Sequence, residues 1–148
     1  MCEMLGNQYY ITKKFNLALS EFEKVLLKHP KNNCAKKKLV ICNIKLGLIR
    51  KAFDDFYYLL MNNINCLLKC DFAKDECPCI EIIYDIESYQ CKLNDFEKNL
   101  ALGMLWISLN IEESIEYFNK VLNYERKFRK IFNVITKLNQ IHNKKIRG

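Results

Sequence analysis

Five of the eight cysteines lie between residues 66 and 91, where their thiols are the side chains with the greatest capacity for chemistry. Four thiolates can hold a zinc ion tetrahedrally. The four closest together in the sequence are Cys66, Cys70, Cys77 and Cys79. Their C-x3-C and C-x-C spacing, however, departs from the paired C-x2-C spacing that is typical of zinc sites. We therefore keep zinc as an alternative and expect reduced, structural cysteines with no metal and no cofactor.

The two histidines do not form a recognisable catalytic arrangement. His29 precedes Pro30 at a predicted helix end, where a positive charge suits the helix dipole, and His142 falls in the last predicted helix. Neither has a serine or cysteine nearby in a nucleophile motif, and the sequence has no glycine-rich loop that could hold phosphate. Acidic pairs at 54–55 and 112–113 are typical of solvated helix faces or helix starts. We expect no enzyme activity.

The charge is moderately basic, with 24 Lys and Arg against 17 Asp and Glu and a net charge of +7. A nucleic-acid-binding domain usually concentrates its positive charge on one stripe. Here the basic residues are spread along the chain, apart from the run Lys36, Lys37 and Lys38 and the segment 144–147. Nucleic acid is therefore not the favoured partner. An RNA-binding helical repeat remains an alternative, which salt-dependent affinity for RNA would support.

The first 15 residues lack the basic start and unbroken apolar run of a signal peptide. No apolar stretch approaches the roughly 20 residues that span a bilayer. We expect a cytoplasmic protein with no membrane association, in a reducing environment where cysteines stay reduced.

Helices are favoured because the chain contains only 4 glycines and 2 prolines. Apolar residues recur at three-to-four spacing in residues 16–28, with charged residues on the other face. Pro30 is expected to end this helix, and Gly47 to take a left-handed conformation just beyond the next one. The length suits one domain, so the sequence predicts a single all-α domain.

A period of 34 residues relates the first two helical segments. It relates Leu5 to Leu39, Ala18 to Ala52, Phe22 to Phe56 and Val25 to Leu59. Such a period indicates a unit that buries its apolar face by stacking against its neighbours.

The first unit resembles the tetratricopeptide repeat. It carries that family's residues in order, with only Cys2 in place of the leading tryptophan: Leu5, Gly6, Tyr9, Ala18, Phe22 and Pro30. The resemblance implies a right-handed superhelical solenoid of antiparallel helix pairs. Gly6 and Ala18 are then expected where the two helices approach most closely, with Tyr9 and Phe22 filling the adjoining space.

The later units are less regular. The second departs from the pattern at Val40, Asn43 and Ile64, and a further copy of the second helix has Ser114 and Phe118 at the corresponding positions. We expect about four units, at 1–32, 33–64, 65–94 and 95–127. The unit at 65–94 is shortened and irregular, with short helices at about 66–73 and 79–91. A helix at about 128–142, with apolar residues at 128, 131, 132, 135, 138 and 141, is expected to cap the array.

The resemblance also implies a partner-binding surface, because the first helix of each unit lines the concave face of such a solenoid. The residues expected there are Asn7, Tyr10, Ile11, Lys37, Lys38, Ile41 and Lys45. Their amide and ammonium groups suit an extended peptide with an acidic residue or a free carboxylate. We therefore expect a scaffold or adaptor for protein binding that works as part of a complex.

Two other roles stay open. Family members that bind chaperone tails use a carboxylate clamp of Lys and Asn, which is incomplete here because Glu3 and Lys38 occupy two of its positions. The chain could also be a structural subunit of a larger assembly. In either case the lysines could simply form a solvated helix face, and Tyr10 could pack in the wall of the groove.

Overall fold

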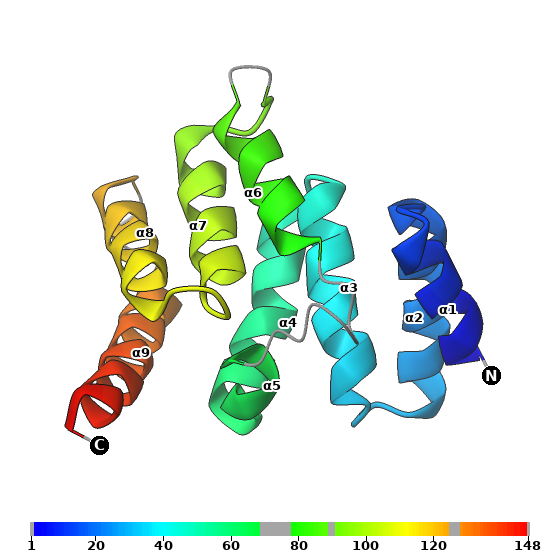
Figure 1. Cartoon of the computed structure of the whole chain (residues 1–148), viewed down its shortest axis with the longest axis horizontal. Helices are drawn as coiled ribbons and strands as arrows, with labels where there is room; N and C mark the ends of the chain where they lie inside the picture. Colours follow the sequence, from blue (N-terminus) through cyan, green and yellow to red (C-terminus); the bar gives the residue numbers. More distant parts are fainter. Residues whose placement is uncertain (1, 69–77, 89–90, 125–127, 148) are drawn as a thin grey trace. The chain divides into compact units, whose positions relative to one another are not determined.

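The computed structural model describes residues 2–68, 78–88, 91–124 and 128–147, which contain nine helices and no strand (Figure 1). The predicted all-α class is therefore confirmed. The chain divides into two compact units, residues 1–77 and 78–148, and the boundary falls inside the segment expected to be irregular. None of the described helices is both long enough and apolar enough to cross a membrane.

The first unit contains two helix pairs and a short fifth helix. These helices are α1 (Cys2–Ile11), α2 (Phe15–Lys28), α3 (Asn33–Lys45), α4 (Ile49–Asn62) and α5 (Ile64–Leu68). The helix α1 packs on α2, α2 on α3, and α3 on α4, so sequential helices are neighbours in space. This order is the one expected of stacked helical hairpins.

Local signals define the ends of α3. The Asn32 side chain caps its start by accepting a hydrogen bond from the Ala35 backbone N–H at 3.1 Å. At its end, Gly47 has φ +83°, so the predicted left-handed glycine is confirmed. The Leu48 N–H donates to the Asn43 carbonyl and the Gly47 N–H to the Ile44 carbonyl, which together form a Schellman motif.

The close approach of α1 and α2 depends on Gly6. A Cβ atom at this position would lie 2.9 Å from Cε1 of Phe22, whose ring is fully buried. Ala18 is also fully buried, as the resemblance implied. In the second pair, Ala52 and Phe56 are both fully buried at the matching positions. The 34-residue period therefore corresponds to repeated core packing.

The second helix pair departs from the first at Asn43, which occupies the position that Tyr9 has in the first pair. Its side chain is fully buried, and neither of its polar atoms has a hydrogen-bond partner among the described residues. A buried amide without a partner costs about 1–3 kcal/mol. This pair therefore carries a local penalty that the first pair does not.

The second unit contains α6 (Cys79–Glu87), α7 (Asp95–Trp106), α8 (Ile111–Tyr124) and α9 (Arg129–Arg147). A capping box starts α7, in which the Asn94 side chain accepts from the Glu97 N–H at 2.8 Å and the Glu97 carboxylate accepts from the Asn94 N–H at 3.5 Å.

Helix α9 packs on α8. Its predicted apolar stripe is partly wrong: Phe132 is 53% exposed, and Val134, which the pattern left out, is fully buried.

The packing of α7 on α8 repeats that of α1 on α2. A Cβ atom on Gly103 would lie 2.9 Å from Cε1 and Cζ of Phe118. Ser114, the small residue of this pair, donates a buried hydrogen bond from its hydroxyl to the Gly103 carbonyl at 2.6 Å. The sequence pattern missed Gly103 because Phe118 follows it by fifteen residues, whereas Phe22 follows Gly6 by sixteen. One residue fewer between the glycine and the phenylalanine therefore hides the repeat.

The contact between Gly103 and Phe118 leads to a stability prediction. At an exposed helix position Gly→Ala stabilises by about 0.5–1 kcal/mol, because alanine loses less backbone entropy. At position 103 the added methyl overlaps a buried ring, so we expect Gly103→Ala to destabilise the protein by about 1–3 kcal/mol. Urea unfolding followed by circular dichroism measures the change.

The matched control is the same substitution in a Phe118→Leu background. Removal of the ring leaves room for the methyl, so there we expect Gly103→Ala to be neutral or stabilising. Equal destabilisation in both backgrounds would show that the ring is not the cause.

Candidate functional site

Three of the residues predicted for the binding surface come together between α1 and α3. The Lys38 ammonium donates a hydrogen bond to Oδ1 of Asn7 at 2.7 Å, although the two residues are 31 positions apart. Its Nζ also lies 5.7 Å from the centre of the Tyr10 ring, which is within the range of a cation–π contact. Successive first helices thus bring an ammonium, an amide and an aromatic ring to one place.

Burial divides the predicted binding residues into two groups. Tyr10 and Ile41 are only 3% and 5% exposed, so they offer almost no surface to a partner. Tyr10 instead meets Phe15 and Phe22 edge to face, with ring centroids 6.0 and 6.2 Å apart. Those that present more surface are Asn7, Ile11, Lys37, Lys38 and Lys45.

Apolar side chains of α1 enlarge this surface. Met4 and Ile11 are 62% and 50% exposed, and Leu5 is 38% exposed. Leu5 belongs to the pattern that the first unit shares with the repeat family, but the structure leaves much of its side chain exposed. The surface therefore combines ammonium groups with exposed methyl and thioether groups, which the sequence pattern did not indicate.

The three consecutive lysines do not form one cluster. Residues adjacent in a helix point about 100° apart. The Lys36 ammonium accordingly lies 3.7 Å from the centre of the Tyr58 ring on α4, whereas Lys38 reaches Asn7 on α1. The run of three lysines in the sequence is thereby divided between two sides of α3.

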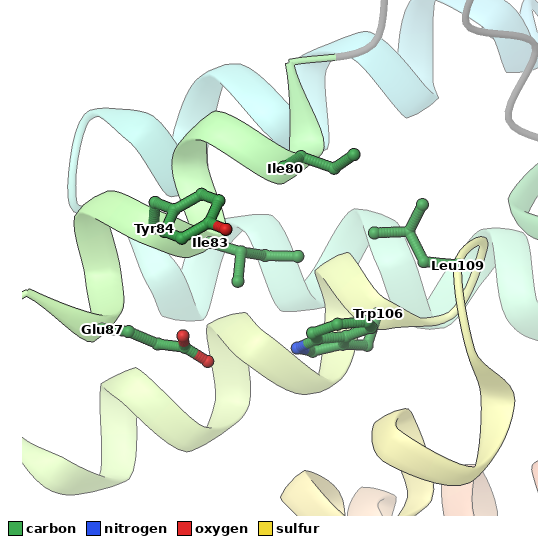
Figure 2. A pocket seen from close by; sticks show the side chains of 6 residues that line it. All are labelled: Ile80, Ile83, Tyr84, Glu87, Trp106 and Leu109. Carbon is green, nitrogen blue, oxygen red and sulfur yellow. The ribbon is translucent and has the colours of Figure 1, made fainter.

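A pocket of about 330 Å³ lies in the second unit (Figure 2). Helix α6 contributes Ile80, Ile83, Tyr84 and Glu87, while Trp106 comes from the end of α7 and Leu109 from the loop that follows. The Trp106 indole nitrogen is shielded from solvent and has no hydrogen-bond partner in the described part of the chain. The sequence patterns gave no indication of this pocket.

Glu87 is held at the pocket by α8. Its carboxylate accepts a hydrogen bond from the Tyr117 hydroxyl at 3.2 Å. Burial raises the pKa of Tyr117 above its usual value, and the negative charge of Glu87 raises it further. The phenol therefore stays protonated at neutral pH and acts as the donor of this hydrogen bond.

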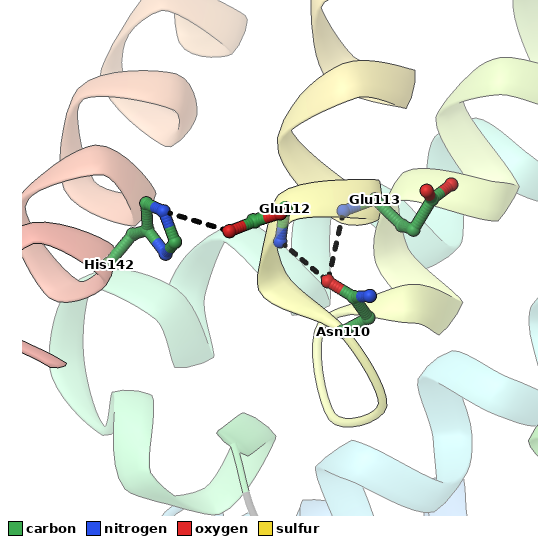
Figure 3. A network of polar contacts seen from close by, with 4 residues as sticks. All are labelled: Asn110, Glu112, Glu113 and His142. Atoms are coloured by element: carbon green, nitrogen blue, oxygen red, sulfur yellow. Dashed lines mark hydrogen bonds and ion pairs between the residues drawn. The ribbon is translucent and has the colours of Figure 1, made fainter. Parts of the chain in front are cut away.

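His142 links two helices of the second unit (Figure 3). Its Nε2 lies 3.3 Å from Oε1 of Glu112 and joins α9 to the start of α8. Oδ1 of Asn110 accepts from the backbone N–H groups of Glu112 and Glu113 at 3.0 and 3.4 Å. The acidic pair therefore marks a helix start, as predicted.

The cysteine prediction needs a correction. Cys79 is disulfide-bonded, whereas Cys34, Cys42 and Cys91 are free. The expectation that every cysteine is reduced is thus wrong, because it came from the presumed compartment and not from which sulfurs lie within bonding distance. Disulfides persist mainly in oxidising environments, so this bond does not fit the reducing location that was predicted.

The zinc alternative loses one ligand with Cys79, since a disulfide sulfur is not a thiolate. Cys70 and Cys77 lie outside the described residues. Cys66 is directed elsewhere, with its Sγ donating to the Asn33 carbonyl at 3.6 Å. Within the described residues, no group of three or more His, Cys, Asp or Glu side chains is placed to hold a metal ion.

Comparison of the chain with protein-family models, with curated proteins and with solved structures finds no match. The geometry of the chain itself therefore carries the functional argument.

The free cysteines lead to a second prediction. Burial raises the pKa of the Cys42 thiol to about 12, whereas Cys34 is exposed. Alkylation requires an accessible thiolate, so we expect iodoacetamide at pH 8 to modify Cys34 and leave Cys42 intact until the protein unfolds. Peptide mass spectrometry measures both sites in one digest. Comparable labelling of the two cysteines in folded protein would contradict the burial of Cys42.

Proposed function

We propose that this chain is a tetratricopeptide-like repeat protein that binds a partner protein through the exposed surface of α1 and α3. The observation that carries the proposal is the Lys38–Asn7 hydrogen bond at 2.7 Å, which joins the first helices of two successive helix pairs. The repeated burial of Ala18 with Phe22 and of Ala52 with Phe56 supports the assignment to this family. A right-handed solenoid follows from the proposal.

The chemistry of this surface favours an extended peptide with a carboxylate. Lys37, Lys38 and Lys45 supply ammonium groups, and the Asn7 amide can donate to a peptide carbonyl. Because Lys38 is bound to a neutral amide oxygen, it can exchange this contact for a charged acceptor, which makes a stronger hydrogen bond. Exposed Met4 and Ile11 can cover apolar side chains of the same peptide.

Binding of an acidic chaperone tail is a narrower form of this proposal. Lys38 and Asn7 supply one ammonium and one amide of the kind such a clamp uses. A role as a subunit of a larger assembly is the second candidate, and it is favoured by Leu27, which is 85% exposed on α2. Both are binding roles.

The test is a quantitative pull-down from native lysate with the intact chain and a Lys37→Glu, Lys38→Glu variant. The reversal replaces attraction by repulsion, so we expect a captured partner to be depleted about tenfold or more. The matched control is Lys28→Glu, Lys31→Glu, which makes the same charge change at exposed positions at the end of α2 and in the turn before α3. Circular dichroism confirms that both variants fold.

The outcomes distinguish binding at the surface of α1 and α3 from a non-specific effect of net charge. Loss of one partner from the Lys37, Lys38 variant alone supports binding at α1 and α3. Equal capture by all three proteins contradicts it, and equal depletion from both variants shows a non-specific effect of net charge.

A further inference from the structure

The pocket of the second unit has an apolar end and a polar end. Ile80 and Leu109 lie together at one end, and the Glu87 carboxylate lies at the other (Figure 2). The indole nitrogen is on the side of the Trp106 ring that faces Glu87. Such a division suits a side chain with an aliphatic stem and a polar head.

The charge of the residues around the pocket determines which polar head group it favours. Glu87 is the acidic residue of the pocket lining, and it is exposed. Helix α6 also carries Glu81 and Asp85 and has no Lys or Arg, although the whole chain has a net charge of +7. The field at the pocket is therefore locally negative, which favours a cation.

The aromatic residues favour the same ligand. Tyr84 is 72% exposed at the rim, and Trp106 forms one wall. The faces of both ring types attract ammonium and guanidinium groups, with tryptophan the stronger. Two aromatic rings next to one carboxylate thus offer a cation both charge and face contacts.

We propose that this pocket binds a lysine or arginine side chain of a partner protein. The aliphatic stem packs against Ile80, Ile83 and Leu109, and the charged head lies between the Glu87 carboxylate and the aromatic rings. The partner is a protein chain because apolar surface at the rim of the pocket stays exposed. Ile80 and Tyr84, which line the pocket one helical turn apart on α6, are 46% and 72% exposed, so their outer faces can contact neighbouring residues of the same partner.

This site is independent of the proposed surface on α1 and α3. It lies in the other unit and selects the opposite charge. Failure of one proposal therefore leaves the other unaffected, and the Lys37→Glu, Lys38→Glu variant is expected to bind the basic probe described below as well as the intact chain does.

The experiment uses the indole N–H signal of Trp106 to report binding at the pocket. It is the one tryptophan of the chain, so a ¹⁵N-labelled protein gives a single indole N–H signal. The probe is the acetylated and amidated peptide Leu-Ala-Ala-Lys-Ala-Ala-Leu, titrated into the full chain. We expect a saturable shift of the indole signal. No shift at millimolar peptide would overturn the proposal.

Two further ligands separate the alternatives. The same peptide with norleucine in place of lysine keeps the stem and removes the charge, and we expect it to bind about fivefold more weakly. Equal binding would show a purely apolar site. n-Butylammonium tests whether a free amine suffices, and we expect it to bind about tenfold more weakly than the peptide. Equal binding would overturn the assignment to a protein partner.

The matched variants are Glu87→Gln and Glu81→Gln, which remove one charge each from α6. We expect the first to weaken binding of the lysine peptide about fivefold and the second to leave it nearly unchanged. An equal loss in both would assign the effect to the net charge of α6 and overturn the proposal. A shift of the indole signal with protein concentration alone would show that a second copy of the chain occupies the pocket.

Discussion

A glycine packed against a buried phenylalanine ring limits the distance between paired helices at both ends of this chain. In the first unit the ring of Phe22 occupies the space that a side chain on Gly6 would need, and in the second Phe118 does the same to Gly103. The contact lets the helix backbones approach closely and buries the ring completely. The hydroxyl of Ser114 adds a hydrogen bond to the Gly103 carbonyl across the second of these contacts.

Much of the fold could be predicted because its signals are local. Three-to-four periodicity located the helices, and Gly47 marked the end of α3 through its need for a positive φ. The period of 34 residues also located Ala18 and Ala52 in the core. The match between Gly6 and Gly103 was missed because a fixed register does not tolerate a spacing to the phenylalanine that is one residue shorter.

Features that depend on distant contacts could not be predicted. The sequence left open whether Tyr10 lies on the binding surface or packs in the wall of the groove, and its packing on Phe15 and Phe22 decides for burial. The disulfide at Cys79 depends on which sulfur lies beside it, and the pocket beside Trp106 depends on how α6 packs against α7.

The two proposed binding surfaces arise in the same way. Close packing of helices leaves side chains at the edges of the contact exposed, and their charge then selects the partner.

The most direct test of the glycine–phenylalanine contacts is the NMR spectrum of protein labelled at its 4 glycines. A glycine Hα held against an aromatic ring is shielded by the ring current and shows a nuclear Overhauser effect to the ring protons. We expect both signs for Gly6 with Phe22 and for Gly103 with Phe118. Gly47, which has open space where its Cβ would be, is the internal reference. Unshifted signals from Gly6 and Gly103, without Overhauser effects to either ring, would contradict the account.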